Sequence, residues 1–131
     1  MGNHIETPRK VLLIATGGTI ACRETENGLA PVLDGESLLR ELPELASVCD
    51  TEVLDLMQRD STDITAADRM QMARAVWERR GEYDGFVIAH GTDTLACTAA
   101  LLHHLLPGID RPVVVTGSML PMGAEGSDAP G

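Results

Sequence analysis

Aromatic side chains and lysine are scarce in this chain of 131 residues. It contains one Trp, one Tyr and one Phe, and its single lysine is Lys10. A core must therefore be built from aliphatic residues and methionine, which disfavours an all-β sandwich and favours alternating strands and helices. With 44% hydrophobic residues, the length suits one domain with a substantial core.

Positive charge and long apolar runs are also in short supply. Ten Lys and Arg residues stand against 20 Asp and Glu, which gives a formal net charge of -10. A nucleic-acid backbone would repel such a surface, so we expect no nucleic-acid partner. No apolar run approaches the roughly 18–20 residues that span a bilayer, so we expect no membrane partner either. The polar start, MGNHIETPRK, lacks the apolar segment of a signal peptide and predicts a cytoplasmic location.

The cysteines are few and scattered. Cys22, Cys49 and Cys97 form no CxxC pair. This spacing disfavours a metal site or a disulfide framework, so we predict reduced thiols and no metal.

Continuous apolar runs predict buried parallel strands. Val11–Ala15 is such a run, and Gly85–Ala89 and Pro112–Val115 are further predicted strands. Thr51–Met57 alternates loosely, with Val53, Leu54 and Leu56 apolar, and is also predicted as a strand. Helical spacing predicts three helices between them, over Glu36–Leu45, Ala66–Arg80 and Thr94–Leu106. The alternating order implies helices on both faces of a mostly parallel sheet. We therefore predict a three-layer α/β domain of flavodoxin-like or Rossmann-like form.

Two helices carry further local signals. Thr65 and Thr94 are placed to cap the second and third predicted helices, and Asp68 follows Thr65 at capping-box spacing. The second helix is predicted to bury one face, formed by Met70, Ala73, Val76 and Trp77.

Each predicted strand is followed by hydroxyl side chains. The four segments read Thr16–Thr19, Arg59–Asp63, His90–Thr94 and Thr116–Met119. Ligands bind outside the carboxyl ends of parallel strands, so these segments predict a site. Each one alone would be ordinary turn chemistry, because Gly, Ser, Thr and Asp are common turn and cap residues.

The absence of known sequence motifs excludes several kinds of site. Gly17-Gly18-Thr19 is neither GxGxxG nor a P-loop, and no GxSxG elbow is present. A hydroxyl nucleophile, Thr19, remains a candidate, because glycines let a ligand approach the backbone closely. His90 is either its base or a hydrogen-bonded structural residue.

The segments ATGGTIA (15–21) and HGTDT (90–94) together resemble the paired signature of bacterial-type L-asparaginases. DSTD (60–63) and PVVVTGSMLP (112–121) are similar to the substrate-binding segment and to the strand and loop that follow. The resemblance covers nearly the whole chain and implies hydrolysis of L-asparagine, with glutamine a further substrate, by a homo-oligomer that needs no cofactor. It also implies that residues 1–131 are an incomplete N-terminal domain, with the C-terminal domain absent.

The resemblance assigns roles residue by residue. Thr19 is implied as the nucleophile and Thr92 as the second catalytic threonine. Asp93 and Ser61 are implied to bind the charged ends of the amino acid, with Thr62 beside them. Ser118 matches a position whose backbone faces the reacting amide.

Two family features have no counterpart at the expected place. The family pairs its second threonine with a lysine, but Lys10 precedes the first predicted strand. Many members carry a loop tyrosine where this chain has Leu29, and its only tyrosine is Tyr83. Two alternatives therefore stay open: an amino-acid-binding module or fragment without turnover, and a flavodoxin-like interaction domain without a ligand.

Overall fold

Four parallel strands form the centre of the molecule. The computed structural model describes residues 8–18, 22–31, 34–118 and 125–126. The strands are β1 (Lys10–Ala15), β4 (Asp50–Asp55), β5 (Gly85–Ala89) and β6 (Val113–Thr116), in the order β4-β1-β5-β6. The predicted parallel sheet is confirmed, with strand bounds that shift by one or two residues.

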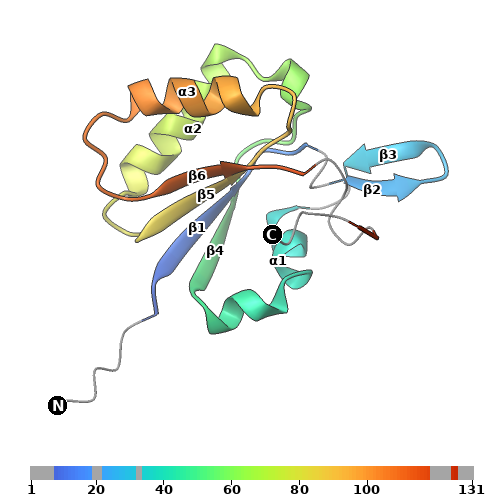
Figure 1. The fold of residues 1–131 in the computed structure, drawn as a ribbon, viewed down its shortest axis with the longest axis horizontal. Helices are drawn as coiled ribbons and strands as arrows, with labels where there is room; N and C mark the ends of the chain where they lie inside the picture. The colour runs from blue at the N-terminus through green and yellow to red at the C-terminus, as the bar shows by residue number, and fades with distance from the viewer. Residues whose placement is uncertain (1–7, 19–21, 32–33, 119–124, 127–131) are drawn as a thin grey trace.

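Helices cover both faces of this sheet. α2 (Ala66–Arg79) and α3 (Leu95–Leu105) lie over one face, and α1 (Gly35–Arg40) lies against the other, beside β4 (Figure 1). The chain thus winds first over one face and then over the other, which places the change of direction between β1 and β5. In doubly wound sheets this switch point is where ligands bind.

The core between the sheet and the α2–α3 layer is aliphatic, as the scarcity of aromatics requires. Leu12 and Ile14 of β1 and Ile88 of β5 are almost fully buried in it. They pack with Met72 and Val76 of α2. Burying one such side chain contributes about 1.5–3 kcal/mol, so this layer holds the strand ends in place.

The predicted buried face of α2 is partly wrong. Ala73 and Val76 are buried, but Met70 and Trp77 are 46% and 41% exposed. The helix is turned so that Met72 faces the sheet instead. Trp77 is covered on its outer side by Arg80, whose guanidinium lies 3.9 Å from the ring centre. A cation over the indole ring stabilises the exposed aromatic without burying it.

The first predicted helix is shorter than the sequence suggested. α1 ends at Arg40, and Pro43 begins a separate 3-10 turn, η2 (Pro43–Ser47). The predicted single helix is therefore two shorter elements. Proline is favoured at the first helical position, because it has no N–H to leave unpaired there.

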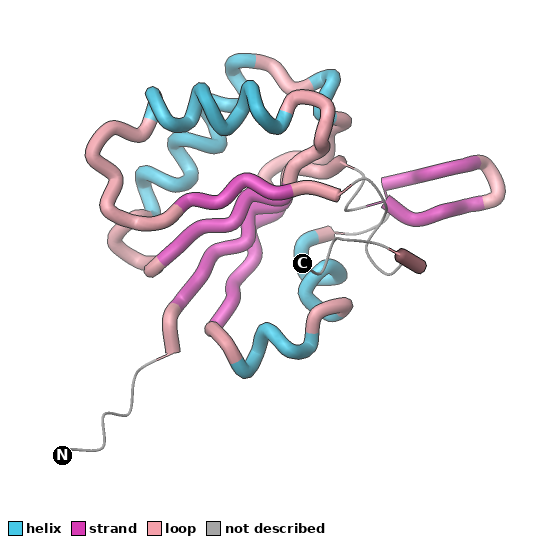
Figure 2. The backbone as a smooth tube through the Cα atoms, viewed as in Figure 1, coloured by secondary structure: helices cyan, strands magenta, loops and turns pink. Residues whose placement is uncertain are grey.

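A hairpin absent from the sequence prediction lies between β1 and α1. It consists of β2 (Cys22–Thr25) and β3 (Gly28–Pro31), which pair antiparallel and stand apart from the main sheet (Figure 2). Gly28 has φ +97°, a conformation that favours glycine, so Asn27-Gly28 is a turn signal that the sequence did contain.

The longest helices of the described chain are α2 and α3. Within the described residues, no helix combines the length and the hydrophobicity needed to cross a bilayer.

Candidate functional site

Two glycines bring the loop after β1 into backbone contact with two other loops. Gly17 and Gly18 have φ of +106° and +87°. A Cβ on Gly17 would lie 2.6 Å from the carbonyl oxygen of Arg59, after β4. A Cβ on Gly18 would lie 2.5 Å from Cα of Gly91, after β5. Both positions therefore require glycine for two reasons: the positive φ disfavours other residues, and a Cβ would collide with the neighbouring loop.

Thr16 fixes the start of this loop. Its side chain is fully buried, and its Oγ1 donates a hydrogen bond of 2.6 Å to the carbonyl of Ala89. The carbonyl of Thr16 accepts from the N–H of Arg59 at 2.9 Å. The end of β1 is thus tied to β5 on one side and to the loop after β4 on the other.

The loops after β4 and β5 meet at Ser61. This residue begins a short 3-10 turn, η3 (Ser61–Asp63), which Asp60 caps by accepting from the N–H of Thr62. Ser61 is buried, and its Oγ accepts from the N–H of Asp93 at 3.1 Å. A Cβ on Gly91 would lie 2.8 Å from the same oxygen.

Thr94 joins the same two loops, which corrects the sequence prediction. It stands at the N-cap of α3, but its side chain makes no capping hydrogen bond. Its hydroxyl donates instead to the carbonyl of Ser61 at 2.7 Å. Thr65, in contrast, caps α2 in a complete capping box with Asp68, as predicted.

The loop after β6 completes the arrangement. A Cβ on Gly117 would collide with the carbonyl oxygen of His90 and lie 3.3 Å from Cγ2 of Thr92. Thr92 is half-buried, and Ser118, next to Gly117, is buried. The described parts of the loops that follow all four strands therefore contact one another at the switch point.

The predicted site residues are distributed unevenly over this junction. Ser61 and Asp93 are joined by a hydrogen bond, and Thr92 borders the Gly117 loop, where a Cβ on Gly117 would lie 3.3 Å from its Cγ2. Thr62 is exposed, and its hydroxyl bonds Asp60 rather than the other site residues. Thr19 lies outside the described residues.

The chemistry of the junction suits a small zwitterion. Asp93 is exposed, so its carboxylate is accessible to an ammonium group. Ser61 uses its oxygen as an acceptor and keeps a hydroxyl hydrogen that a carboxylate could accept. Two residues joined by a hydrogen bond therefore offer a carboxylate acceptor and a hydroxyl donor.

His90 is a structural residue and not an exposed base. Its ring is fully buried, with Nδ1 2.5 Å from the carbonyl oxygen of Gly91 and Nε2 2.8 Å from Oγ1 of Thr98. Burial lowers the pKa of His90, although the hydrogen bond to Gly91 works against this; nearby Arg69 lowers it further. A neutral ring with both nitrogens engaged has no position left for a nucleophile's proton.

Lys10 lies at the opposite end of β1 from the junction, as predicted. Its Nζ is 3.0 Å from Oε1 of Glu52, and its charge lies 5.0 Å from the centre of the Tyr83 ring. The hydroxyl of Tyr83 donates to the other oxygen of Glu52. This cluster joins the starts of the strands and is remote from Ser61 and Asp93.

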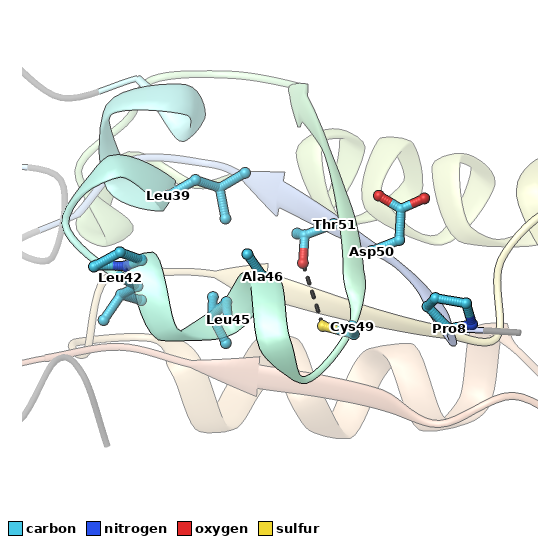
Figure 3. A pocket seen from close by; sticks show the side chains of 9 residues that line it. Pro8, Leu39, Leu42, Leu45, Ala46, Cys49, Asp50 and Thr51 are labelled. Carbon is cyan, nitrogen blue, oxygen red and sulfur yellow. Dashed lines mark hydrogen bonds between the residues drawn. The ribbon is translucent and has the colours of Figure 1, made fainter. Parts of the chain in front are cut away.

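A separate cavity of about 300 Å³ lies between η2 and the start of β4 (Figure 3). Three leucines, two prolines and an alanine line it, together with Asp50, Cys49 and Thr51, and the Sγ of Cys49 is 3.3 Å from Oγ1 of Thr51. None of the predicted site residues lines it. Over the residues with described positions, no cluster of three His, Cys, Asp or Glu side chains could hold a metal ion.

Sequence reasoning located the loops but missed how they are held together. Thr16 and Thr94 were visible as hydroxyl residues after predicted strands, yet their partners, the carbonyls of Ala89 and Ser61, are distant in sequence. Gly117 carried no signal beyond its residue type.

Comparison with known proteins identifies the family of this chain. Residues 10–131 match the family model described as "Asparaginase, N-terminal". The chain is 43% identical to an L-asparaginase of Thermococcus kodakarensis and 38% identical to L-asparaginase 1 of Escherichia coli K12, over 92% of this chain in both cases. It spans 37% of the length of each of these relatives.

Solved structures give the same result. The structure of the Thermococcus kodakarensis enzyme superposes with a TM-score of 0.77, covering 92% of this chain and 37% of that one. L-asparaginase I of Vibrio cholerae, 31% identical, superposes with a TM-score of 0.83 over 94% of this chain and 38% of that one. Sequence and fold therefore agree that this chain belongs to the asparaginase family, in which it corresponds to the N-terminal part.

Proposed function

We propose that the junction of the four loops binds L-asparagine and serves its hydrolysis to L-aspartate and ammonia. The observation that carries this proposal is the direct backbone contact between the loops after β1, β4 and β5, made by Gly17, Gly18 and Gly91. Such contact brings hydroxyls and a carboxylate from separate strands to one point. The names of the relatives support the choice of substrate.

The proposed roles follow from charge and hydrogen bonding. Asp93 receives the α-ammonium group, and Ser61 donates to the α-carboxylate, with Thr62 beside it. The side-chain amide then lies between Thr19 and Thr92, near the backbone of Ser118. In this scheme Thr19 attacks the amide carbon, the C–N bond breaks with release of ammonia, and water cleaves the resulting ester to give aspartate.

A second candidate function is favoured by the position of Lys10. A threonine hydroxyl is a weak nucleophile without a base, and general-base help is worth typically 10²–10⁴-fold in rate. Lys10 is engaged with Glu52 at the far end of the sheet, and His90 is buried. Residues 1–131 by themselves would then bind the amino acid without turning it over.

The remaining expectations belong to the same proposal. The protein acts in the cytoplasm as a homo-oligomer on a small-molecule substrate, asparagine or glutamine, without a cofactor. Residues 1–131 are taken as one domain of this protein. The strongly acidic composition supports the absence of a nucleic-acid partner.

Ammonia release from asparagine and from glutamine tests the proposal. The purified chain and its Thr19→Ala variant are compared with asparagine in excess. Release that the variant abolishes supports hydrolysis by Thr19. Binding of aspartate without any release supports the second candidate function. Equal release from both proteins would contradict the proposed nucleophile.

A further inference from the structure

Beneath the junction, a row of polar side chains crosses three elements. Arg69 of α2 places its Nε 2.8 Å from Oγ1 of Thr98, which lies on α3. The same Oγ1 is 2.8 Å from Nε2 of His90, at the end of β5. Thr98 and His90 are both fully buried, so bulk water does not reach the hydrogen bonds of the His90 ring.

The direction of every hydrogen bond in this row can be deduced. The Gly91 carbonyl has no hydrogen, so Nδ1 of His90 must carry the proton between them. A buried neutral imidazole has one N–H, so Nε2 is an acceptor and the Thr98 hydroxyl must donate to it. The same hydroxyl oxygen accepts from Arg69, whose guanidinium can only donate.

The neutral state of the ring follows from its surroundings. Full burial opposes a positive charge, and the guanidinium of Arg69 opposes it further. If the ring were charged, both of its nitrogens would carry a proton, and the Thr98 hydroxyl could no longer donate to Nε2. Arg69 therefore supplies a donor to Thr98 and also disfavours protonation of His90.

The row of hydrogen bonds ends at the peptide group that precedes Thr92. The Gly91 carbonyl belongs to the peptide group that joins Gly91 to Thr92, so the His90 ring fixes the plane of that peptide. Two residues further on, Asp93 is held from the other side by Ser61. The segment bearing Thr92 and Asp93 is thus fastened at both ends.

We propose that Arg69, Thr98 and His90 form a one-way hydrogen-bond relay that positions the Gly91–Asp93 segment for ligand binding. They are positioning residues, since none of them faces the junction itself. The consequence for ligand binding rests on the proposed function, whereas the relay and its direction do not.

The first test is the tautomer of His90 in the unmodified chain. In ¹⁵N NMR spectra, the relay requires a neutral ring protonated at Nδ1. A ring protonated at Nε2, or at both nitrogens at neutral pH, would overturn the proposal. This measurement needs no variant, so it stands even if a substitution prevents folding.

The second test compares Thr98→Val, which removes the hydroxyl at nearly constant shape, with Thr98→Ser, which keeps it. Thr98→Val should accelerate hydrogen exchange of the Asp93 amide roughly three- to tenfold, the equivalent of one net hydrogen bond. Thr98→Ser should restore the original rate. The amide of Ile14, in a strand flanked on both sides, reports global unfolding and serves as the reference.

A matched pair on α2 tests the first member of the relay. Arg69→Met should accelerate exchange at Asp93 relative to Ile14, whereas Arg74→Met, at an exposed position of the same helix, should not. Equal rates at Asp93 in the original chain, Thr98→Val and Arg69→Met would overturn the relay.

Titration with L-aspartate tests the consequence for binding. Thr98→Val should weaken binding roughly three- to tenfold, and Thr98→Ser should restore it. Unchanged affinity in Thr98→Val would overturn the positioning role. Absence of binding in the original chain would count against the proposed function, while the tautomer and the Asp93 exchange rate would still decide the relay.

Discussion

Gly91 and Ser61 lie so close that a methyl group on Gly91 would be 2.7 Å from Cβ of Ser61. Gly91 follows β5 and Ser61 follows β4, two strands separated in the sheet by β1. The contact therefore spans the end of β1 and closes the junction over it.

Gly91→Ala should destabilise the protein by about 1–3 kcal/mol, because the buried Ser61 would have to move. Gly81→Ala is the matched control, since a Cβ there meets nothing within 4 Å. It should be neutral or stabilise by up to about 1 kcal/mol. Urea unfolding measures both values. Similar stability of the two variants would contradict the close contact between Gly91 and Ser61.

Gly18→Ala separates the cost of backbone conformation from the cost of crowding. Gly18 has φ +87° and would place a Cβ 2.5 Å from Gly91, whereas Gly108 has φ +72° with nothing within 4 Å. Gly108→Ala should cost about 1–2 kcal/mol, from the left-handed conformation alone. Gly18→Ala should cost clearly more in the same unfolding experiment. A smaller loss at Gly18 than at Gly108 would contradict close packing at the switch point.

Thr94→Val and Thr65→Val distinguish the junction from ordinary helix capping. Thr65→Val removes a side-chain cap and should cost about 1 kcal/mol of stability without affecting aspartate binding. Thr94→Val removes the hydrogen bond to the Ser61 carbonyl and should cost about 1 kcal/mol while also weakening aspartate binding. Unfolding and calorimetry together give both quantities for each variant. Identical binding by the two variants would contradict the role of Thr94 at the junction.

Stability should depend on the protonation of His90. Burial lowers its pKa in the folded state, so the unfolded chain takes up the proton at higher pH, near 6.5. The contribution of the neutral ring is therefore fully present above about pH 6.5 and is lost as the pH falls below it. His90→Gln should flatten this slope of unfolding free energy between about pH 8 and pH 5.5. A slope unchanged by the substitution would contradict a neutral buried ring.

Most of the sheet could be predicted from the sequence, because strands buried on both faces need continuous apolar runs. Val11–Ala15 and Gly85–Ala89 show this pattern, and both are strands. The β2–β3 hairpin lies outside the sheet and has no such run, so apolar patterning does not predict it. Its sequence signal is the Asn27-Gly28 turn. The buried face of α2 was misassigned, because Trp77 looked like a core residue but is accommodated at the surface by Arg80.

The meeting of the four loops at one edge of the sheet was also predictable, but the contacts between them were not. The carboxyl ends of parallel strands lie at the same edge, so the hydroxyl residues after each strand were expected to lie near one another. The partner of Thr94, however, is a backbone carbonyl 33 residues away, and a local pattern cannot identify it. The same holds for His90, whose partner Thr98 becomes visible only once α3 is packed against the sheet.

Calorimetric titration of the chain with L-aspartate shows whether the four loops bind an amino acid. We expect measurable heat that Asp93→Asn abolishes, because the ammonium group loses its carboxylate. Asp110→Asn, at an exposed position before the start of β6 and so at the other end of the sheet, should leave this heat intact. No heat from the original chain, or equal heat from the Asp93→Asn variant, would contradict an amino-acid site at the four loops.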